Sequence, residues 1–523
     1  MTTNNLIARQ AALQAVEAIA VQPSALIEYQ SHGRVLIIGE HEPAIFALSC
    51  LENELKGQIL QTDTASDADN VTIPLADRSL VVQGHLGNFT IRLGEANTPA
   101  FQTLSADIIL DLQPEPALAM AVKPPGYQVC STDYPSIEIA CAGLSEMTGT
   151  FEKPRFFDYD PAICAHARSG QPGCSNCINA CPAEAIISLR EQIEVDPYLC
   201  QGGGACATVC PTGAIRYVYP PLEDQINRLR LLLKTYLEAG GESPVVVIVS
   251  ESESEQLPGL SDNHLLFVVE ELASVGVELW LGALAFGARQ VILWDQGVPE
   301  SVRPNLNNQI HFAVALLEVL GHGSTGILIG HDLEALPVPG GPLCERATYA
   351  GQNDKRNMLY AAIDALHGGA VGETHLLPVG APMGRVLVDS DKCTLCMACT
   401  SVCPASALVA GGERPALLFQ EINCVQCGIC HRACPEAAIQ LEPRVNLDRD
   451  DRRRGVVINE QQPFLCVSCG KPFATRNVID AMLEKLADHH MFQTERALRR
   501  LKMCDDCRVV DVVQDDDMMG PGN

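Results

Sequence analysis

The sequence predicts a multidomain chain of α/β and α+β class, and three observations lead to this prediction. Its 523 residues suffice for about three to five domains at roughly 100–200 residues each. Short apolar segments alternate with helical patterns in two separate regions, which favours small parallel sheets flanked by helices. The 23 cysteines gather in close-set groups between and after these regions, which is typical of modules folded around metal.

The first α/β region covers residues 1–125. Residues 34–40 read as a buried strand followed by a helix, residues 79–94 as a hairpin, and residues 106–112 as a further strand. Only Gly39 follows the first strand, so the glycine-rich dinucleotide fingerprint is absent. A structural or docking domain is therefore favoured over flavin or nicotinamide binding.

Two later stretches carry the strongest chemical signal, CTLCMACTSVCP from Cys393 to Pro404 and CVQCGICHRACP from Cys424 to Pro435. Each has three cysteines at two-residue gaps and a fourth before proline, the bacterial-ferredoxin pattern for [4Fe-4S] clusters, in which the fourth cysteine ligates the opposite cluster. Zinc is the alternative for CxxC pairs, but eight cysteines in this doubled pattern favour clusters. The expected ligand sets are Cys393, Cys396, Cys399 and Cys434 for one cluster, and Cys424, Cys427, Cys430 and Cys403 for the other.

An imperfect copy of this ferredoxin-like module lies upstream, in CAHARSGQPGCSNCINACP and CQGGGACATVCP. Cys164 must reach in from a longer loop, and Gly203 stands where a cysteine is expected. Three thiolates support a [3Fe-4S] cluster, a [4Fe-4S] cluster with an open or exogenous ligand, or an empty site, and Cys130 or Cys141 is a possible replacement ligand. The expected sets are Cys164, Cys174, Cys177 and Cys210, and the incomplete Cys200, Cys206 and Cys181.

The second α/β region covers residues 221–345. Residues 244–251, 264–271 and 289–295 are strand-like, residues 277–288 are helical by pattern, and residues 325–330 close the series. The alternation predicts a small parallel sheet flanked by helices.

The last cysteines are of a different kind. CVSCGKPF holds Cys466 and Cys469, and KMCDDCR holds Cys504 and Cys507, with a mixed-charge helical stretch between. Two CxxC knuckles across a spacer predict a structural zinc site of zinc-ribbon type, and iron is the alternative.

These segments give the expected domain order. It is an N-terminal α/β domain (1–125), a degenerate two-cluster module (126–220), a second α/β domain (221–345), a linker (346–385), a complete two-[4Fe-4S] module (386–445), and a four-cysteine zinc segment with an acidic tail (455–523).

Charge and hydropathy limit the partners. The formal net charge of −28 opposes binding to nucleic acid and to anionic membrane. The longest apolar run, residues 277–294, contains Glu278 and Arg289 and falls short of a membrane span. The N-terminal sequence lacks a signal-peptide pattern. A cytoplasmic location without membrane insertion is therefore expected, where thiols stay reduced.

The order of parts resembles the cytoplasmic 4Fe-4S ferredoxin-type proteins associated with bacterial formate dehydrogenases. The matching features are FEKPRFFDYDPAICAHARSG, GCSNCINACPAEAI, DKCTLCMACTSVCP and CVQCGICHRACP. The middle domain resembles the delta subunit of methyl-viologen-reducing hydrogenase in ELASVGVELWLGALAFGARQVILW. That domain usually carries cysteines for a two-iron cluster, and none lies between Cys210 and Cys344, so a docking scaffold is expected here.

The expected function is a multi-cluster relay of single electrons between a dehydrogenase, formate dehydrogenase by resemblance, and a downstream acceptor. Such a subunit needs no acid or base residue, so no catalytic residue is assigned. Two alternatives remain, a flavin-containing oxidoreductase subunit and a non-catalytic assembly or redox-sensing factor for a metalloenzyme.

Overall fold

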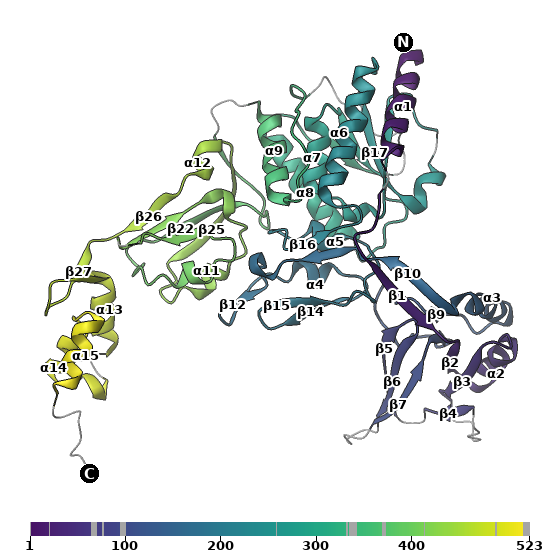
Figure 1. Ribbon diagram of the computed structural model, residues 1–523, viewed down its shortest axis with the longest axis horizontal. Helices are drawn as coiled ribbons and strands as arrows, with labels where there is room; N and C mark the ends of the chain where they lie inside the picture. Colours follow the sequence, from purple (N-terminus) through teal and green to yellow (C-terminus); the bar gives the residue numbers. More distant parts are fainter. Residues whose placement is uncertain are drawn as a thin grey trace.

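The computed structural model describes residues 2–19, 21–63, 71–75, 78–94, 101–257, 259–330, 333, 343–368, 373–412, 414–486 and 489–515. Over this part of the chain the predicted multidomain α/β class is confirmed, with several separate sheets. Figure 1 shows the N-terminal sheets at one end, the C-terminal cysteine segment at the other, and the cluster-motif modules between them. The acidic tail predicted from the sequence lies beyond residue 515, outside the described residues.

The N-terminal domain is a parallel sheet covered on both faces. Strand order is β4-β3-β2-β8-β9, and alternate residues of β2 face opposite cores: Val35 and Ile37 contact the helices, while Leu36 and Ile38 contact an antiparallel sheet. The elements are β2 (Arg34–Gly39), α2 (His41–Cys50), β3 (Lys56–Gln61), β4 (Thr72–Pro74), β5 (Ser79–His85), β6 (Asn88–Gly94), β7 (Phe101–Ala106), β8 (Ile108–Asp111), β9 (Tyr127–Val129), α3 (Tyr134–Leu144) and the 3₁₀ turn η1 (Ser145–Met147).

The middle domain has a four-stranded parallel sheet in the order β18-β17-β19-β20. Helix α7 is buried along its whole length, which explains its apolar sequence. The elements are α6 (Leu222–Glu238), β17 (Val245–Ser250), η3 (Glu251–Gln256), β18 (His264–Val269), η4 (Leu272–Ser274), α7 (Val277–Ala285), β19 (Gln290–Leu293), α8 (Arg303–Val319) and β20 (Ile327–Ile329).

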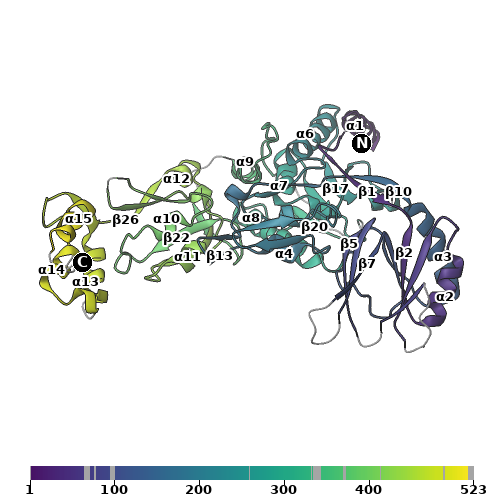
Figure 2. The ribbon, with the colours of Figure 1, turned by 60° about the horizontal axis from the view of Figure 1, so that its bottom comes forward.

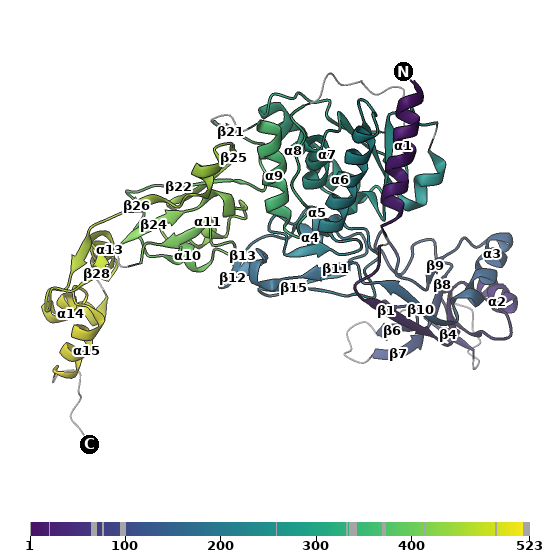
Figure 3. The same cartoon turned by 45° about the horizontal axis from the view of Figure 1, so that its top comes forward.

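Two helices join this middle domain from elsewhere in the sequence. Helix α1 (Thr2–Glu17) packs against α6, although it begins the region expected to form the N-terminal domain. Helix α9 (Lys355–His367) packs against α7 and lies in the segment expected to be a linker. Both helices contribute buried side chains to the largest apolar core of the described chain. Figure 3 shows α1, α6, α7 and α9 side by side.

The upstream cluster-motif module follows an antiparallel ribbon of β1 (Leu26–Ser31) and β10 (Gly149–Pro154). It is small and has several two-stranded sheets, because cysteine loops take the place of an extended core. The elements are β11 (Phe157–Tyr159), η2 (Pro161–Ile163), β12 (Ala167–Arg168), β13 (Gln171–Pro172), α4 (Asn176–Ala180), β14 (Ile186–Leu189), β15 (Gln192–Val195), α5 (Ala205–Thr208) and β16 (Ile215–Tyr217).

The downstream cluster-motif module has the same short helices between strand pairs. Figure 2 shows α11 of this module next to β13 of the upstream module. The elements are β21 (Thr374–Leu376), β22 (Gly384–Val388), α10 (Ala398–Ser401), β23 (Leu408–Ala410), β24 (Ala416–Phe419), η5 (Glu421–Asn423), α11 (Ile429–Ala433), β25 (Ile439–Asn446), α12 (Arg449–Arg453) and β26 (Val456–Glu460).

The C-terminal segment is a hairpin followed by three helices. Its elements are β27 (Pro463–Leu465), β28 (Pro472–Thr475), α13 (Arg476–Leu486), η6 (His490–Phe492), α14 (Glu495–Arg500) and α15 (Asp505–Val513). The hydroxyl of Thr475 donates to the carbonyl of Thr394, 3.0 Å away, and Lys485 pairs with Glu436 at 3.0 Å. These contacts place the segment against the loop that contains Cys393.

None of the helices in the described ranges combines the length and apolar character that crossing a bilayer requires.

Candidate iron–sulfur centres

Three of the four cysteine loops share one backbone conformation. In each loop, the residues two and four positions after the first cysteine have left-handed φ angles: Leu395 and Met397, Gln426 and Gly428, and Gly202 and Gly204, with φ between 54° and 77°. Non-glycine residues adopt this region rarely and at a cost of about 1 kcal/mol or more. Its recurrence at Leu395 and Gln426 therefore indicates a loop shaped for a ligand.

The Cys-Pro ends of three of the four motifs, at Cys181, Cys403 and Cys434, are also alike. A backbone N–H four residues after the cysteine donates to its sulfur, from Ala185 to Cys181 at 3.3 Å, from Ala407 to Cys403 at 3.2 Å, and from Ala438 to Cys434 at 3.3 Å. Such N–H···S contacts orient the thiolate and stabilise its charge. The backbone at these three motif ends thus holds the cysteine sulfur in an orientation suited to a metal ligand.

Each of two compact cavities is lined by three cysteines of one motif and by the fourth cysteine of the other motif, as expected from the spacing. One cavity is lined by Cys393, Cys396, Cys399 and Cys434, together with apolar side chains such as Leu395 and Ile439. The other is lined by Cys164, Cys174, Cys177 and Cys210, so the longer loop does bring Cys164 to the group. In both cavities the fourth cysteine comes from the opposite motif.

The remaining complete set gathers beside these cavities. The neighbours that raise the pKa of Cys430, after burial, are first Cys424, Cys427 and Cys403, and then Cys399 of the adjacent set. The side-chain amide of Gln426 donates to the sulfur of Cys424 at 3.3 Å.

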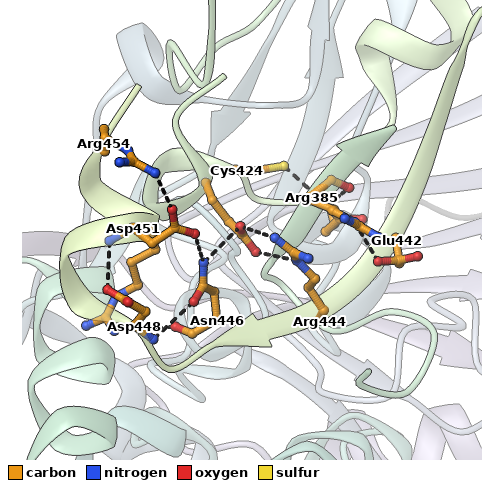
Figure 4. A network of polar contacts seen from close by, with 11 residues as sticks. Arg385, Cys424, Glu442, Arg444, Asn446, Asp448, Asp451 and Arg454 are labelled. Atoms are coloured by element: carbon orange, nitrogen blue, oxygen red, sulfur yellow. Dashed lines mark hydrogen bonds and ion pairs between the residues drawn. The ribbon is translucent and has the colours of Figure 1, made fainter. Parts of the chain in front are cut away.

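A polar network supports the start of the Cys424 loop. The carboxylate of Glu421 accepts two hydrogen bonds from Arg444, at 2.8 and 2.6 Å, and Asn446 links Glu421 to Asp451. Both members of the Glu421–Arg444 pair are largely buried. Figure 4 shows this network next to Cys424. It fixes the turn that presents Cys424 to the other thiols.

The buried thiols are crowded. Burial, followed by the neighbouring thiols, raises the pKa of Cys177 and of Cys399 to about 12. The same causes raise the pKa of Cys174 to about 11. A metal core that binds thiolate offsets this cost, because its positive charge favours the ionised sulfur.

The donor set fits iron–sulfur clusters. Four thiols line each of the two apolar cavities. Backbone N–H groups donate to the sulfurs of Cys403 and Cys434 in the downstream module. When bound, such a cluster supplies one-electron oxidation and reduction, with a potential set by cluster type, hydrogen bonds to sulfur and solvent exposure.

The incomplete site keeps the loop and lacks one thiol. After burial, the neighbouring thiols of Cys200 and Cys181 are the main causes that raise the pKa of Cys206. Gly203 occupies the position that Cys396 and Cys427 hold in the equivalent loops. A Cβ atom added to Gly203 would meet no atom within 4 Å, and the φ of Gly203 is outside the left-handed region. The site therefore has room for a fourth ligand at this position.

The two candidate replacement cysteines lie elsewhere. Cys141 is fully buried in the N-terminal core, with its sulfur 3.5 Å from the carbonyl oxygen of Ala47. Cys130 packs against the same core. Both lie apart from the cluster that contains Cys200 and Cys206.

The two cluster-motif modules meet directly, which the sequence did not reveal. A small apolar cluster of Ala165, Val402 and Ile429 joins them, with Cys174 on one side and Cys427 on the other. Helix α11 lies against β13, and Arg432 donates to the carbonyl of Pro172 at 2.7 Å. The Cys164 set and the Cys424 set are therefore neighbours across the module boundary.

Arg356 of helix α9 bridges the same boundary. Its guanidinium donates to the carbonyls of Pro211 at 3.4 Å, of Ile422 at 2.7 Å and of Cys424 at 3.1 Å, and to Pro382 at 2.8 Å. Pro211 follows Cys210, so one cation contacts the cysteine loops of both modules. No local pattern marked this residue, because its partners are distant in sequence.

The four C-terminal cysteines form a tetrad. Their sulfur atoms lie within 4.8 Å of one another, and Cys469 and Cys504 are 3.7 Å apart. A tetrahedral Zn²⁺ site with Zn–S bonds of about 2.3 Å has sulfurs about 3.8 Å apart. Despite its burial, Cys466 has a pKa lowered to about 6 by backbone N–H groups of Cys504, Cys469 and Ser468. The tetrad can thus hold a tetrahedral metal ion.

Comparisons with known proteins agree with the cysteine loops. Residues 392–439 match the 4Fe-4S dicluster domain, and residues 193–216 match the 4Fe-4S binding domain. Two regions of this chain are ferredoxin-type 4Fe-4S domains. The second match includes Gly203.

Two relatives match short stretches. The indolepyruvate oxidoreductase subunit IorA of Pyrococcus horikoshii is 48% identical over 48 residues, which is 9% of this chain and 7% of the relative. The 7Fe ferredoxin of Hydrogenibacillus schlegelii is 39% identical over 41 residues, which is 8% of this chain and 53% of the relative. This chain is thus similar to these proteins only over short stretches, which span about half of the ferredoxin and a small part of the oxidoreductase subunit. It is an iron–sulfur protein of electron-transfer type.

Proposed function

We propose that this protein relays single electrons through a series of iron–sulfur clusters that crosses both cluster-motif modules. The observation that carries the proposal is the contact of the modules at Ala165, Val402 and Ile429, with Cys174 and Cys427 on its two sides. A relay needs neighbouring centres, and two modules held apart by a flexible linker would not supply them.

The neighbour relations extend the series in both directions. The half-buried Cys206 of the incomplete site has Cys177 and Cys210 of the next set among the neighbours that raise the pKa of its thiol. Cys430 likewise has Cys399 of the last set nearby. The proposed order is therefore the Gly203 site, the Cys164 set, the Cys424 set and the Cys393 set. The C-terminal segment adjoins the last of these through Thr394.

The proposed cofactors follow from the ligand sets. We assign [4Fe-4S] clusters to the three four-cysteine sets and a [3Fe-4S] cluster to Cys181, Cys200 and Cys206. The retained loop around Gly203 supports this assignment, as does the likeness to a ferredoxin named for seven irons. Zinc at the tetrad is proposed from the sulfur spacing.

The proposed partner is a dehydrogenase in the cytoplasm, and formate dehydrogenase is the first candidate. The resemblance of the sequence supports this choice, and the likeness to an oxidoreductase subunit favours a redox enzyme in general. The net charge of −28 favours a basic docking face on that partner.

The experiment is a stopped-flow mixture of the anaerobically purified protein with formate dehydrogenase and formate. Bleaching of the visible cluster absorption at a rate that depends on both proteins supports the proposal. The control is the variant Ile429→Lys, which inserts a charge at the module contact. It should take up electrons at one module and deliver them slowly to the other. If formate and formate dehydrogenase cause no bleaching but another dehydrogenase does, formate dehydrogenase is wrong as the partner and the proposal of an electron relay stands.

The alternative of a flavin-containing subunit is not supported at the position where parallel sheets of this topology usually bind ligands. Ligands bind at the carboxyl ends of strands where the chain reverses its order, here between β17 and β19. The carboxylate of Glu253 fills that position, because it accepts hydrogen bonds from the hydroxyl of Ser250 and from the N–H of Gly297. A phosphate would have to displace this carboxylate.

A further inference from the structure

The N-terminal domain contacts the turn that leads into the incomplete site. Strands β1 and β10 form a ribbon between the N-terminal sheets and the upstream module (Figure 1). Two residues of this ribbon, Tyr29 and Lys153, donate hydrogen bonds to the backbone of the turn just before Cys200. Cys200 is the first thiol of the incomplete site, so the ribbon joins the N-terminal domain directly to that site.

Lys153 binds the backbone of this turn through its ammonium group. The Nζ atom donates to the carbonyl oxygen of Tyr198 at 2.9 Å and to that of Cys200 at 2.7 Å. The same atom lies 4.9 Å from the centre of the Tyr29 ring, which is a cation–π contact. Lys153 is half-buried, and water and salt screen its charge less than that of a fully exposed lysine. A positive charge is therefore held next to the first ligand of the site.

Two aromatic side chains of the N-terminal domain hold the same turn. The hydroxyl of Tyr29 donates to the carbonyl oxygen of Tyr198 at 2.7 Å, and Tyr29 is itself buried in the N-terminal core. The ring of His85 stacks on the ring of Tyr198, with the two centroids 4.3 Å apart. Lys153 thus lies within a packed contact between the N-terminal domain and the upstream module.

The downstream module has an equivalent contact. Cys424 holds the same place in its module as Cys200, and its carbonyl oxygen accepts a hydrogen bond from the guanidinium of Arg356 at 3.1 Å. Lys153 lies on a strand and Arg356 on a helix, about 200 residues apart in sequence. A cation at the same backbone oxygen in both modules, supplied by unrelated elements, indicates a role connected with the cysteine loop.

A fixed cation acts on a cluster through its charge. Reduction adds one negative charge to the cluster, so a positive charge nearby stabilises the reduced form more than the oxidised form. Burial raises the pKa of the Cys200 thiol, whereas the N–H of Gly202 and the charge of Lys153 lower it. The charge of Lys153 therefore acts at the sulfur of Cys200 as well as at its carbonyl oxygen.

We propose that Lys153 raises the reduction potential of the centre held by Cys181, Cys200 and Cys206, so that the N-terminal domain sets the driving force at the first site of the relay. This role rests on the [3Fe-4S] cluster proposed for that site. Lys153 is a positioning residue, because it acts through the charge that it places beside Cys200.

The test is a redox titration of the anaerobically purified full-length protein, followed by the electron paramagnetic resonance signal of the oxidised [3Fe-4S] cluster. In Lys153→Gln the ratio of reduced to oxidised cluster at a fixed potential should fall at least about threefold, which corresponds to about 28 mV for a one-electron couple. Lys153→Arg keeps the charge and should keep the potential close to that of the parent. Lys56→Gln removes the same charge from an exposed position of the same domain and should leave the potential unchanged.

A further variant separates charge from hydrogen bonding. Tyr29→Phe removes the uncharged donor to the Tyr198 carbonyl and keeps the aromatic ring beside Lys153, so it should shift the potential less than Lys153→Gln does. An equal shift in Tyr29→Phe would overturn the role proposed for the charge, because Lys153 would then act only by holding the turn.

The remaining outcomes also decide between the two levels of the account. A [3Fe-4S] signal that is present in the parent and titrates at the same potential in Lys153→Gln would overturn the role of Lys153 and leave the cluster assignment intact. Loss of this signal in Lys153→Gln, with the other clusters retained, would assign Lys153 a structural role and likewise overturn the proposal. A parent protein without the signal would overturn the cluster assignment and the role of Lys153 together.

Discussion

Restoring the missing ligand at Gly203 is the sharpest perturbation that the structure offers. The variant Gly203→Cys places a thiol where the equivalent loops carry Cys396 and Cys427. An added Cβ at this position meets no atom within 4 Å, and the backbone is outside the left-handed region. The substitution should therefore cost little folding energy. The neighbouring left-handed residues Gly202 and Gly204 already hold the loop in its ligand-presenting form.

The expected change follows from the ligand count. Three cysteines support three irons and four support four, so the variant should gain about one iron per chain, from about fifteen to about sixteen. The paramagnetic signal that a [3Fe-4S] cluster gives when oxidised should disappear, because an oxidised [4Fe-4S] cluster is silent. Iron analysis and electron paramagnetic resonance of anaerobically prepared protein measure both effects.

Two control variants separate this effect from nonspecific damage. Gly203→Ala adds the Cβ without the thiol and should leave the iron content and the signal as in the parent. Gly202→Cys adds a thiol one residue earlier, where the Cβ would meet the Phe156 ring at 2.8 Å and the φ is +77°, so it should disturb the loop without gaining iron. The reasoning is refuted if Gly203→Cys folds with unchanged iron content and an unchanged signal.

Three further predictions concern other parts of the chain. Arg356→Gln removes a positive charge near the Cys424 cluster and should lower its reduction potential in a redox titration, whereas Arg356→Lys keeps the charge and should largely retain the potential. A potential that neither variant changes would show that Arg356 contributes only to packing. Asp107→Asn should destabilise the N-terminal domain by about 3 kcal/mol in urea unfolding, because Asp107 is fully buried and accepts from Arg34 and two backbone N–H groups. Although burial opposes it, these hydrogen bonds lower the pKa of Asp107 in the folded protein. The stabilisation that Asp107 provides is therefore fully present above the unfolded-state pKa, and it is lost as the pH falls through the folded-state pKa and the carboxylate is protonated. Equal stability of the wild type and the variant near neutral pH would contradict this. Chelation of the tetrad metal, or Cys469→Ser, should make residues 463–515 sensitive to protease without loss of cluster absorption, and unchanged protease resistance would argue against a structural metal there.

Local spacing in the sequence was enough to predict the cysteine loops and the parallel sheets. The strand at residues 34–40 appears as β2, and the hairpin at residues 79–94 appears as β5 and β6. The crossed grouping of Cys393 with Cys434 was expected from the doubled motif, because in two-cluster ferredoxins the fourth cysteine ligates the opposite cluster. These features depend on residues near one another in sequence or on a motif repeated in one chain.

Contacts between distant segments could not be predicted in the same way. Helix α1 has no signal that assigns it to α6, which lies more than 200 residues away in sequence. Arg356 lies in a stretch that reads as a linker, yet it donates to carbonyl groups in both cluster-motif modules. Such contacts depend on how whole domains pack, and a single sequence carries no periodic signal for that packing.

The central claim is that thiolates of this chain hold several redox-active clusters in series. Iron, sulfide and zinc analysis of anaerobically purified protein, combined with electron paramagnetic resonance during stepwise reduction, tests it most directly. The account predicts about fifteen irons and one zinc per chain, with magnetic interaction between reduced clusters of the two modules. Colourless protein with zinc at every cysteine set would contradict it.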